Sequence, residues 1–468
     1  MLAAKNIVIE LLSAVIWGTA IGLLMAITAN SFVYLVVIAT EYRTSFTLLE
    51  FQLQGQTYSL SSIFSLLAAA VLISVIRKCL DIKNWEGIAD SIYVAHRENP
   101  KIDTKKGLGS TFASLVVISG GGSVGQYGPL VHFGSTIGLF IKNFFKLKMS
   151  PDIFIGCGVA AAIAAGFNAP LAGVLFAHEA ILRHFSLRAI APISIASFSA
   201  SAFGEYFFGN SPALFELSQQ VPPLNEVLPI LLVLGPAFAI ITVCFMITLR
   251  AANSFAALNE RHKTLLPFIA ALICGSVGVF LPEILGLGIG AINDLIAGNI
   301  SLTKVSMLLM AKISMTALCI GFGLFGGIFS PALFIGVSAG SLAAGFFTAI
   351  GYPDLAQVII ISGMAAVAAS VIGAPITSVL IVLELTGSYE YGVAAMVAVI
   401  ISSLVTYRAF GLSFFDRQLL DRGIDMRQGR ESIALSQRLV TTCEHMDFVK
   451  LAAGATGREA YRLMKDSG

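Results

Sequence analysis

The chain has 468 residues, of which 56% are hydrophobic and only 12% are charged. Soluble domains usually carry about 25% charged residues, so this composition excludes an ordinary cytosolic enzyme, a disordered chain and a nucleic-acid-binding protein. The formal net charge of +2, from 29 Lys and Arg against 27 Asp and Glu, indicates no polyelectrolyte partner. The sequence therefore predicts an all-α, multi-pass membrane protein that contacts the lipid bilayer.

Apolar segments follow one another along almost the whole chain. The first, residues 7–26, lacks a clear cleavage site and is predicted to be a retained helix rather than a signal peptide. The other candidates are 60–76, 108–124, 129–142, 153–167, 170–182, 188–208, 227–249, 265–282, 305–323, 331–350, 356–372, 375–387 and 392–407. Several are shorter than the roughly 20 residues of a full span. We therefore expect helices that end inside the membrane, as in transporters and channels.

The two ends of the chain differ in character. Residues 1–425 are assigned to the membrane domain, and the polar, basic residues that begin at Asp416 predict a cytoplasmic side there. Residues 426–468 are expected to form a cytoplasmic tail. Its segments VTTCEHM and EAYRLMK resemble the start of a CBS domain that is cut off early, which would make the chain a piece of a longer protein.

Two blocks of sequence recur in the same order. At an offset of 202 residues, Ile118, Gly121, Gly125, Pro129, Gly134 and Gly138 match Ile320, Gly323, Gly327, Pro331, Gly336 and Gly340. At an offset of 205, Gly158, Ala169, Pro170, Val174, Leu175 and Glu179 match Gly363, Ala374, Pro375, Val379, Leu380 and Glu384. An abundance of Gly and Ala explains one such block more easily than two. The sequence predicts a duplication, with halves of about 60–210 and 227–407.

The Gly-rich blocks before Pro129 and Pro331 give the clearest indication of function. Proline is favoured at the start of a helix, where its missing N–H costs nothing. Each block is therefore predicted to begin a helix, and each helix start presents unpaired N–H groups and a partial positive charge. Two such starts that face one another form an anion site without a cationic side chain. We expect a small inorganic anion as the ligand.

Four segments resemble the CLC family of chloride channels and chloride/proton antiporters. Residues 120–129 (GGGSVGQYGP) are similar to its "GREGP" segment, and residues 326–331 (GGIFSP) to its "GxFxP" segment. Residues 166–173 (GFNAPLAG) are similar to "FNAPLAG", and residues 413–416 (SFFD) to "SxYD". These matches keep the family order over about residues 80–425.

The resemblance implies two inverted halves of tilted and broken helices, a homodimer, and one anion pathway in each subunit. It also implies that backbone amides of Ile328 and Phe329, and those that open a helix at Gly128, bind the anion. Chloride is then a substrate, and no cofactor or metal is expected. The candidate anion-binding residues are Glu86, Gly125, Tyr127, Gly128, Gly327, Ile328, Phe329 and Phe415.

The sequence departs from the family pattern at the gate. The family's gating glutamate, which competes with the anion and carries a proton, corresponds to Tyr127. A phenol stays neutral near pH 7, so Tyr127 packs, donates a hydrogen bond to the anion, or narrows the path. The antiporters' inner proton-transfer glutamate corresponds to Ala180. Its neighbour Glu179 is expected to be structural, because Glu384 repeats it. His178 is a substitute proton carrier or, more simply, a core histidine bonded to the backbone.

The inner anion ligands are altered as well. The family's tyrosine corresponds to Phe415, which lacks the hydroxyl, and its "GSGIP" serine corresponds to Glu86. Glu86 is interpreted either as a relocated inner gate and proton carrier or as a solvated loop charge. Lys312 either sets a positive potential at the inner mouth or snorkels to the interface. His132 is interpreted as a packing residue.

These observations lead to one functional hypothesis and two rivals. We expect a passive, uncoupled transporter of chloride or similar small anions, without enzymatic activity, in a bacterial plasma membrane. One rival is a proton-coupled or fluoride-selective antiporter that uses His178 or Glu86. The other is a transport-dead scaffold or sensor that signals through the CBS-like tail.

Overall fold

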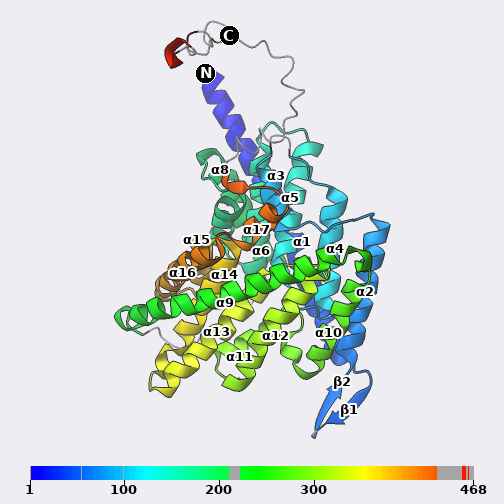
Figure 1. Ribbon diagram of the computed structural model, residues 1–468. Coiled ribbons are helices and arrows are strands. Elements are labelled where there is room, and N and C mark those ends of the chain that lie inside the picture. The colour runs from blue at the N-terminus through cyan, green and yellow to red at the C-terminus, as the bar shows by residue number, and fades with distance from the viewer. Residues whose placement is uncertain are drawn as a thin grey trace.

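The computed structural model describes residues 2–53, 55–97, 100–209, 222–428, 456–459 and 462. Within them the chain is almost entirely helical, and a two-stranded antiparallel hairpin, β1 (Glu50–Leu53) and β2 (Gln56–Ser59), projects from one end (Figure 1). The predicted all-α fold is confirmed. Most of the expected tail, 426–468, lies outside the described residues.

In the described part of the chain, the α-helices form two series of eight, followed by one short helix. The first series comprises α1 (Leu2–Ser45), α2 (Ser61–Cys79), α3 (Ile88–Ala95), α4 (Thr104–Ser119), α5 (Tyr127–Phe144), α6 (Pro151–Phe167), α7 (Pro170–Phe176) with the π-helical turn Ala177–Leu182, and α8 (Leu187–Phe208). The second comprises α9 (Leu224–Leu258), α10 (Leu266–Phe280), α11 (Ile289–Ile296), α12 (Leu302–Gly321), α13 (Phe329–Ala349), α14 (Ala356–Ile372), α15 (Pro375–Thr386) and α16 (Tyr389–Phe410). Helix α17 (Phe414–Asp421) follows.

The two series pack in the same way. Helix α6 packs on α5, α7 and α8, and α14 packs on α13, α15 and α16. Helix α1 packs on α6 and α8, as α9 packs on α14 and α16. The duplication therefore also includes α1, which lies outside the expected first half of 60–210. In Figure 1, α5 lies toward the end that carries α3, and α13 extends toward the end that carries the hairpin, so the halves are inverted.

The helices break at matching positions because the two halves carry the same backbone signals. Helix α6 ends at Asn168, which adopts the left-handed conformation with φ +52°, and α7 begins at Pro170. Helix α14 ends at Gly373, with φ +78°, and α15 begins at Pro375. A left-handed residue stops a helix, and a proline two residues later starts the next one in a new direction.

Glycines let the central helices approach closely. A Cβ atom on Gly158 of α6 would lie 1.9 Å from the carbonyl oxygen of Gly134 on α5. In the second half, a Cβ on Gly336 of α13 would lie 2.6 Å from the carbonyl oxygen of Gly363 on α14. Only glycine permits such backbone contact, and small residues at helix crossings are typical of membrane helix packing.

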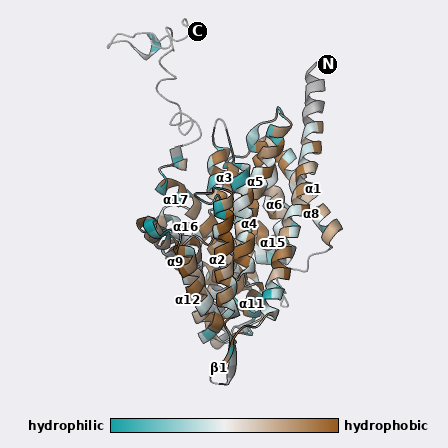
Figure 2. Ribbon diagram, turned by 90° about the vertical axis from the view of Figure 1, so that its right-hand side faces the viewer, coloured by the Kyte–Doolittle hydropathy of each residue, from teal (hydrophilic) through white to brown (hydrophobic). Residues whose placement is uncertain are grey.

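The hydropathy of the surface matches a membrane environment. In the described part of the chain, eight helices are long and apolar enough to span a bilayer. Helix α14 is central, since 94% of its apolar window is buried. The ribbon of the outer helices has the colour of hydrophobic residues along much of its length (Figure 2), and many large hydrophobic side chains are exposed. The protein is a multi-pass integral membrane protein, as the sequence predicts.

Candidate anion-binding site and inner vestibule

The starts of α5 and α13 are joined to each other directly. The N–H of Gly125 donates to the carbonyl oxygen of Gly327 at 2.7 Å, and the N–H of Gly327 donates to the carbonyl oxygen of Gly125 at 2.6 Å. These two amides are therefore occupied by one another. Gly125 and Gly327, expected to bind the anion, instead form the framework that holds the two helix starts together.

The loops that lead to this junction are also matched. Helix α4 ends in a turn with φ +98° at Gly121, and α12 ends in one with φ +94° at Gly323. In both turns the chain folds back to bond the last helical carbonyls. Helix α5 then begins at Tyr127 and α13 at Phe329, so both helices direct their N-terminal N–H groups toward one region.

The remaining candidate amides belong to the first turns of these helices. The N–H groups of Gly128, Ile328 and Phe329 have no intrahelical carbonyl to bond, because the first N–H groups of any helix lack one. A Cβ on Gly128 would lie 2.9 Å from the Cα of Gly327, so the two helix starts touch. The arrangement brings together unpaired N–H donors and the N-termini of two helices, each with a partial positive charge. Such a site can bind a small anion.

A large cavity leads to this junction from one side. Its volume is about 1090 Å³. We call it the inner vestibule. The residues that line it include Gly128, Pro129, Gly327 and Ile328, so the vestibule reaches the starts of both helices. Glu86 and Phe415 also line it, which places these two predicted site residues beside the others.

Basic side chains outnumber acidic ones around the vestibule. Among the described residues that line it, seven are basic and three are acidic: Arg77, Lys83, Lys106, Arg250, Lys263, Arg417 and Arg422 against Glu86, Asp90 and Asp421. Arg250 binds Asp421 with two hydrogen bonds of 3.1 Å, and Arg422 binds Asp90 at 2.7 Å. These pairs attach α17 to α9 and α3, and the excess of positive charge attracts anions.

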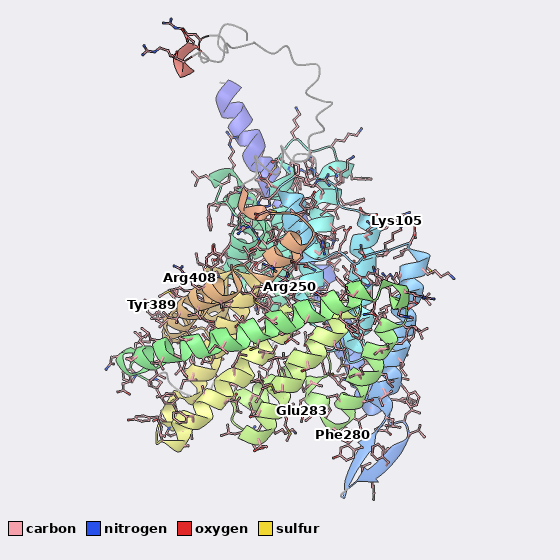
Figure 3. The ribbon with its side chains drawn as sticks, in the orientation of Figure 1. Lys105, Arg250, Phe280, Glu283, Tyr389 and Arg408 are labelled. Atoms are coloured by element: carbon pink, nitrogen blue, oxygen red, sulfur yellow. The ribbon has the colours of Figure 1, made fainter. Side chains whose placement is uncertain are left out.

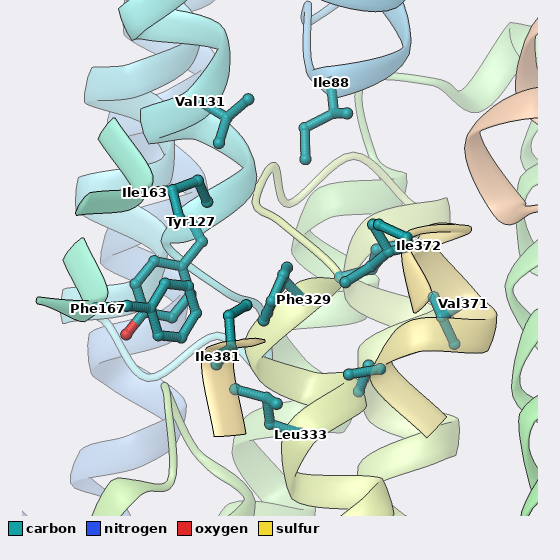
Figure 4. Close-up of a cluster of buried hydrophobic side chains, with 14 of the residues drawn as sticks. Ile88, Tyr127, Val131, Ile163, Phe167, Phe329, Leu333, Val371, Ile372 and Ile381 are labelled. Carbon is teal, nitrogen blue, oxygen red and sulfur yellow. The ribbon is translucent and has the colours of Figure 1, made fainter. Parts of the chain in front are cut away.

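Tyr127 packs into an aromatic cluster and carries no charge toward the site. Its ring stacks on Phe167 with centroids 3.7 Å apart and meets the edge of Phe329 at 5.7 Å (Figure 4). Phe167 and Phe329 are themselves 5.0 Å apart. The Tyr127 side chain is 3% exposed. Of the roles expected for Tyr127, this geometry favours packing and narrowing of the path.

Glu86 lies at the vestibule wall between two cationic or protonatable groups. Its carboxylate is 3.5 Å from Lys106 Nζ and 3.5 Å from His132 Nε2. Its backbone N–H donates to Ser110 Oγ at 3.0 Å. Glu86 is therefore held in place and is not a freely solvated loop charge. The sequence pattern indicates neither Lys106 nor His132 as a partner of Glu86, because their proximity depends on how α4 and α5 pack around the loop before α3.

Residues 178–180, at the position of the antiporters' inner proton-transfer glutamate, are not among the residues that line the vestibule. Glu179 accepts hydrogen bonds from backbone amides at the start of α15, which matches its expected structural role. His178 is buried, and its Nδ1 lies 2.9 Å from the carbonyl oxygen of His184. Ala180 lies buried in the π-helical turn. Of the two roles weighed for His178, this geometry favours the core histidine bonded to the backbone.

Lys312 has neither of the roles expected from the sequence. It is fully buried in α12, and its Nζ donates to the carbonyl oxygens of Ile284 and Gly286 at 2.9 and 3.0 Å. The ammonium group also lies over the Phe334 ring, 4.9 Å from its centroid. The N–H of Gly286 in turn donates to Gly121 at 3.1 Å. Lys312 therefore holds a loop that supports the turn before α5.

Charge differs between the two ends of the molecule. Arg77 and Lys78 end α2 on the side opposite the hairpin, and Lys105 lies toward that same end (Figure 3). Glu283 lies at the hairpin end and pairs with Lys304 at 2.5 Å. The vestibule therefore opens on the basic side.

Comparison with known proteins identifies the family. Residues 66–407 match the family described as voltage gated chloride channel. The H(+)/Cl(−) exchange transporter ClcA of Vibrio vulnificus is 31% identical over 325 residues, which cover 67% of this chain and 69% of that protein.

Two solved structures share the fold. A slow cyanobacterial Cl−/H+ antiporter superposes with a TM-score of 0.77 and 20% identity, over 91% of this chain and 99% of that one. A CLC-type fluoride/proton antiporter gives a TM-score of 0.72 and 22% identity, over 87% and 98%. The chain therefore belongs to the CLC family of voltage-gated chloride channels.

Proposed function

We propose that this protein carries chloride or a similar small anion across the membrane between the starts of α5 and α13. The observation that carries this proposal is the reciprocal pairing of Gly125 and Gly327. It brings two positive helix ends and their unpaired N–H groups to the head of a basic vestibule. The relatives named as chloride exchangers support chloride as the anion.

We propose further that the vestibule faces the cytoplasm. Basic residues gather on the cytoplasmic side of membrane proteins, and the vestibule rim is basic. Anions then reach the helix starts from inside through the wide vestibule. On the outer side they pass the cluster of Tyr127, Phe167 and Phe329, which forms the narrow part of the path.

Transport is proposed to be passive. Tyr127 offers no carboxylate to compete with the anion or to carry a proton, and Ala180 offers no inner acid. Obligatory exchange needs side chains that compete with the anion and carry a proton, and these two positions supply none.

Proton-coupled exchange is the second candidate function. It is favoured by the relatives' names and by the carboxylate of Glu86, which lines the vestibule beside His132. A substitute acid at the inner end would carry protons along a different route from that of the family.

We also propose a homodimer on the basis of the family resemblance. Leu171 and Ile376 occupy matching positions at the starts of α7 and α15 and are 47% and 54% exposed. A second copy or lipid covers such apolar side chains equally well. Cross-linking in native membranes distinguishes a dimer from a monomer.

One experiment tests the function and separates its two forms. Purified protein in liposomes loaded with chloride is diluted into low-chloride buffer, and chloride and proton movements are recorded together. Passive transport predicts chloride efflux without proton uptake. Proton uptake in fixed proportion to chloride supports exchange, and the absence of efflux contradicts anion transport and favours a scaffold role.

A further inference from the structure

Glu86 and His132 form a pair to which the proposed passive transport assigns no role. Glu86 precedes α3, and His132 lies on α5. The Glu86 carboxylate and His132 Nε2 are 3.5 Å apart. Glu86 is 23% exposed to the vestibule, whereas the His132 side chain is 1% exposed. A titratable ring therefore sits behind a carboxylate that water reaches.

Both ring nitrogens of His132 lie near an oxygen that can accept a hydrogen bond. His132 Nδ1 lies 2.9 Å from Ser91 Oγ on α3, and Nε2 faces Glu86. An imidazolium ion donates from both nitrogens, and this site supplies a partner for each. Among the described residues Nε2 makes no hydrogen bond of standard length. The surroundings therefore accommodate a bound proton on the ring.

The other charged groups near the pair are already engaged. From α4, Lys106 lies 3.5 Å from the Glu86 carboxylate. On α3, Asp90 pairs with Arg422 of α17 at 2.7 Å. After the π-helical turn, which packs on α3, Arg183 pairs with Asp416. The net charge of the Glu86–His132–Lys106 group is thus zero with a neutral imidazole and +1 with an imidazolium.

The pair lies beside the anion path. Glu86 lines the vestibule together with Gly128, the start of α5. His132 follows Gly128 by one helical turn on the same helix. A change of charge on the pair therefore alters the electrostatic potential where an anion approaches the two helix starts.

We propose that Glu86 and His132 form a proton-binding site that admits anions to the inner end of the pathway. A hydronium ion in the vestibule gives its proton to the imidazole, and water is left behind. The imidazolium then gives the Glu86–His132–Lys106 group a net charge of +1, which attracts the anion. The proton returns to the vestibule when the pair is deprotonated, so no proton crosses the membrane. This inference rests on the proposed anion transport.

The first test is the pH profile of chloride efflux, with equal pH on both sides of the liposome. Imidazole changes its charge between pH 5 and 8. Wild-type efflux is expected to rise by a factor of about three to ten between about pH 7.5 and about pH 5.5. Glu86→Gln should give high efflux at every pH, and His132→Gln low efflux at every pH. Glu283→Gln, which alters an ion pair at the other end of the protein, is the matched control and should keep the wild-type profile.

A second measurement tests proton binding by Glu86 and His132 without measuring transport. In ¹⁵N-histidine-labelled protein in nanodiscs, the NMR signal that His132→Gln removes should change when the ring gains a proton as the pH is lowered, and this change should differ in Glu86→Gln. A wild-type pH profile in both pair variants, or a His132 signal that does not titrate, overturns the proposal. If wild-type protein gives no efflux at any pH, anion transport itself fails, and the NMR titration still decides whether the pair binds a proton.

Discussion

Glu179 and Glu384 each cap a helix that belongs to the opposite half of the chain. The Glu179 carboxylate accepts hydrogen bonds from the N–H groups of Ile376 and Thr377 at 3.0 and 2.8 Å. The Glu384 carboxylate accepts them from Leu171 and Ala172, both at 2.8 Å. Two acids in apolar helices are thus satisfied by helix N-termini, and the exchange ties the two inverted halves together.

This relationship predicts that Glu384 contributes to stability and does not carry protons. Glu384→Ala should lower the free energy of unfolding by about 1–3 kcal/mol, because two amides of α7 lose a charged partner. Thermal unfolding in detergent measures the change, with the exposed Glu41→Ala as the control. Chloride efflux per folded molecule should stay the same. A variant of unchanged stability with altered proton movement would show instead that Glu384 acts in transport.

Tyr127 is predicted to restrict the outer part of the path. Tyr127→Ala removes the ring that stacks on Phe167, so chloride efflux should increase several-fold. The cavity should also cost about 3–5 kcal/mol of stability, and efflux is therefore compared per folded molecule. Tyr127→Phe keeps the ring and should behave like the wild type. Unchanged efflux in the alanine variant would mean that the anion does not pass this cluster.

The contact between Gly158 and Gly134 is predicted to be essential for folding. A Cβ on Gly158 would lie 1.9 Å from a backbone oxygen, so Gly158→Ala should force α5 and α6 apart and prevent stable assembly. Gly290 in α11 is the matched control, since a Cβ there meets nothing within 4 Å. Gly290→Ala should be neutral or stabilising by up to about 1 kcal/mol. Size-exclusion profiles and thermal unfolding check both variants, and a well-folded Gly158→Ala protein would disprove the close packing.

Lys312 is predicted to stabilise the loop before α11 without shaping the vestibule potential. Lys312→Met leaves the carbonyl groups of Ile284 and Gly286 without their donor and should cost about 2–4 kcal/mol. Chloride affinity, measured by calorimetry, should stay close to that of the wild type. Lys106→Met, which removes a vestibule charge, should instead weaken chloride binding. Equal losses of affinity in the two variants would place Lys312 in the path.

The parts of the fold that depend on local chemistry were predictable from the sequence. The breaks before Pro170 and Pro375 follow from a left-handed residue and a proline, both of which act on the backbone locally. The helix starts near Pro129 and Pro331 follow from the same logic. The duplication is visible because these signals repeat at nearly one offset.

The parts that depend on contacts between distant segments were not predictable. The pairing of Gly125 with Gly327 joins segments in different halves, and no local pattern shows that their amides bond each other. Lys312 lies in an apolar helix, but its sequence position does not reveal which carbonyls it binds. The sequence predicts that His132 packs, and it is buried, but its position facing Glu86 depends on how α3 packs on α5.

The most direct test of the central claim is chloride efflux from liposomes that contain the purified wild-type protein. Liposomes loaded with chloride are diluted into low-chloride buffer with a potassium ionophore to carry the balancing charge. An anion path between α5 and α13 predicts efflux well above that of protein-free liposomes, and greater still with Tyr127→Ala. Efflux no faster than in protein-free liposomes, for both proteins, would contradict the assignment of this site to anion transport.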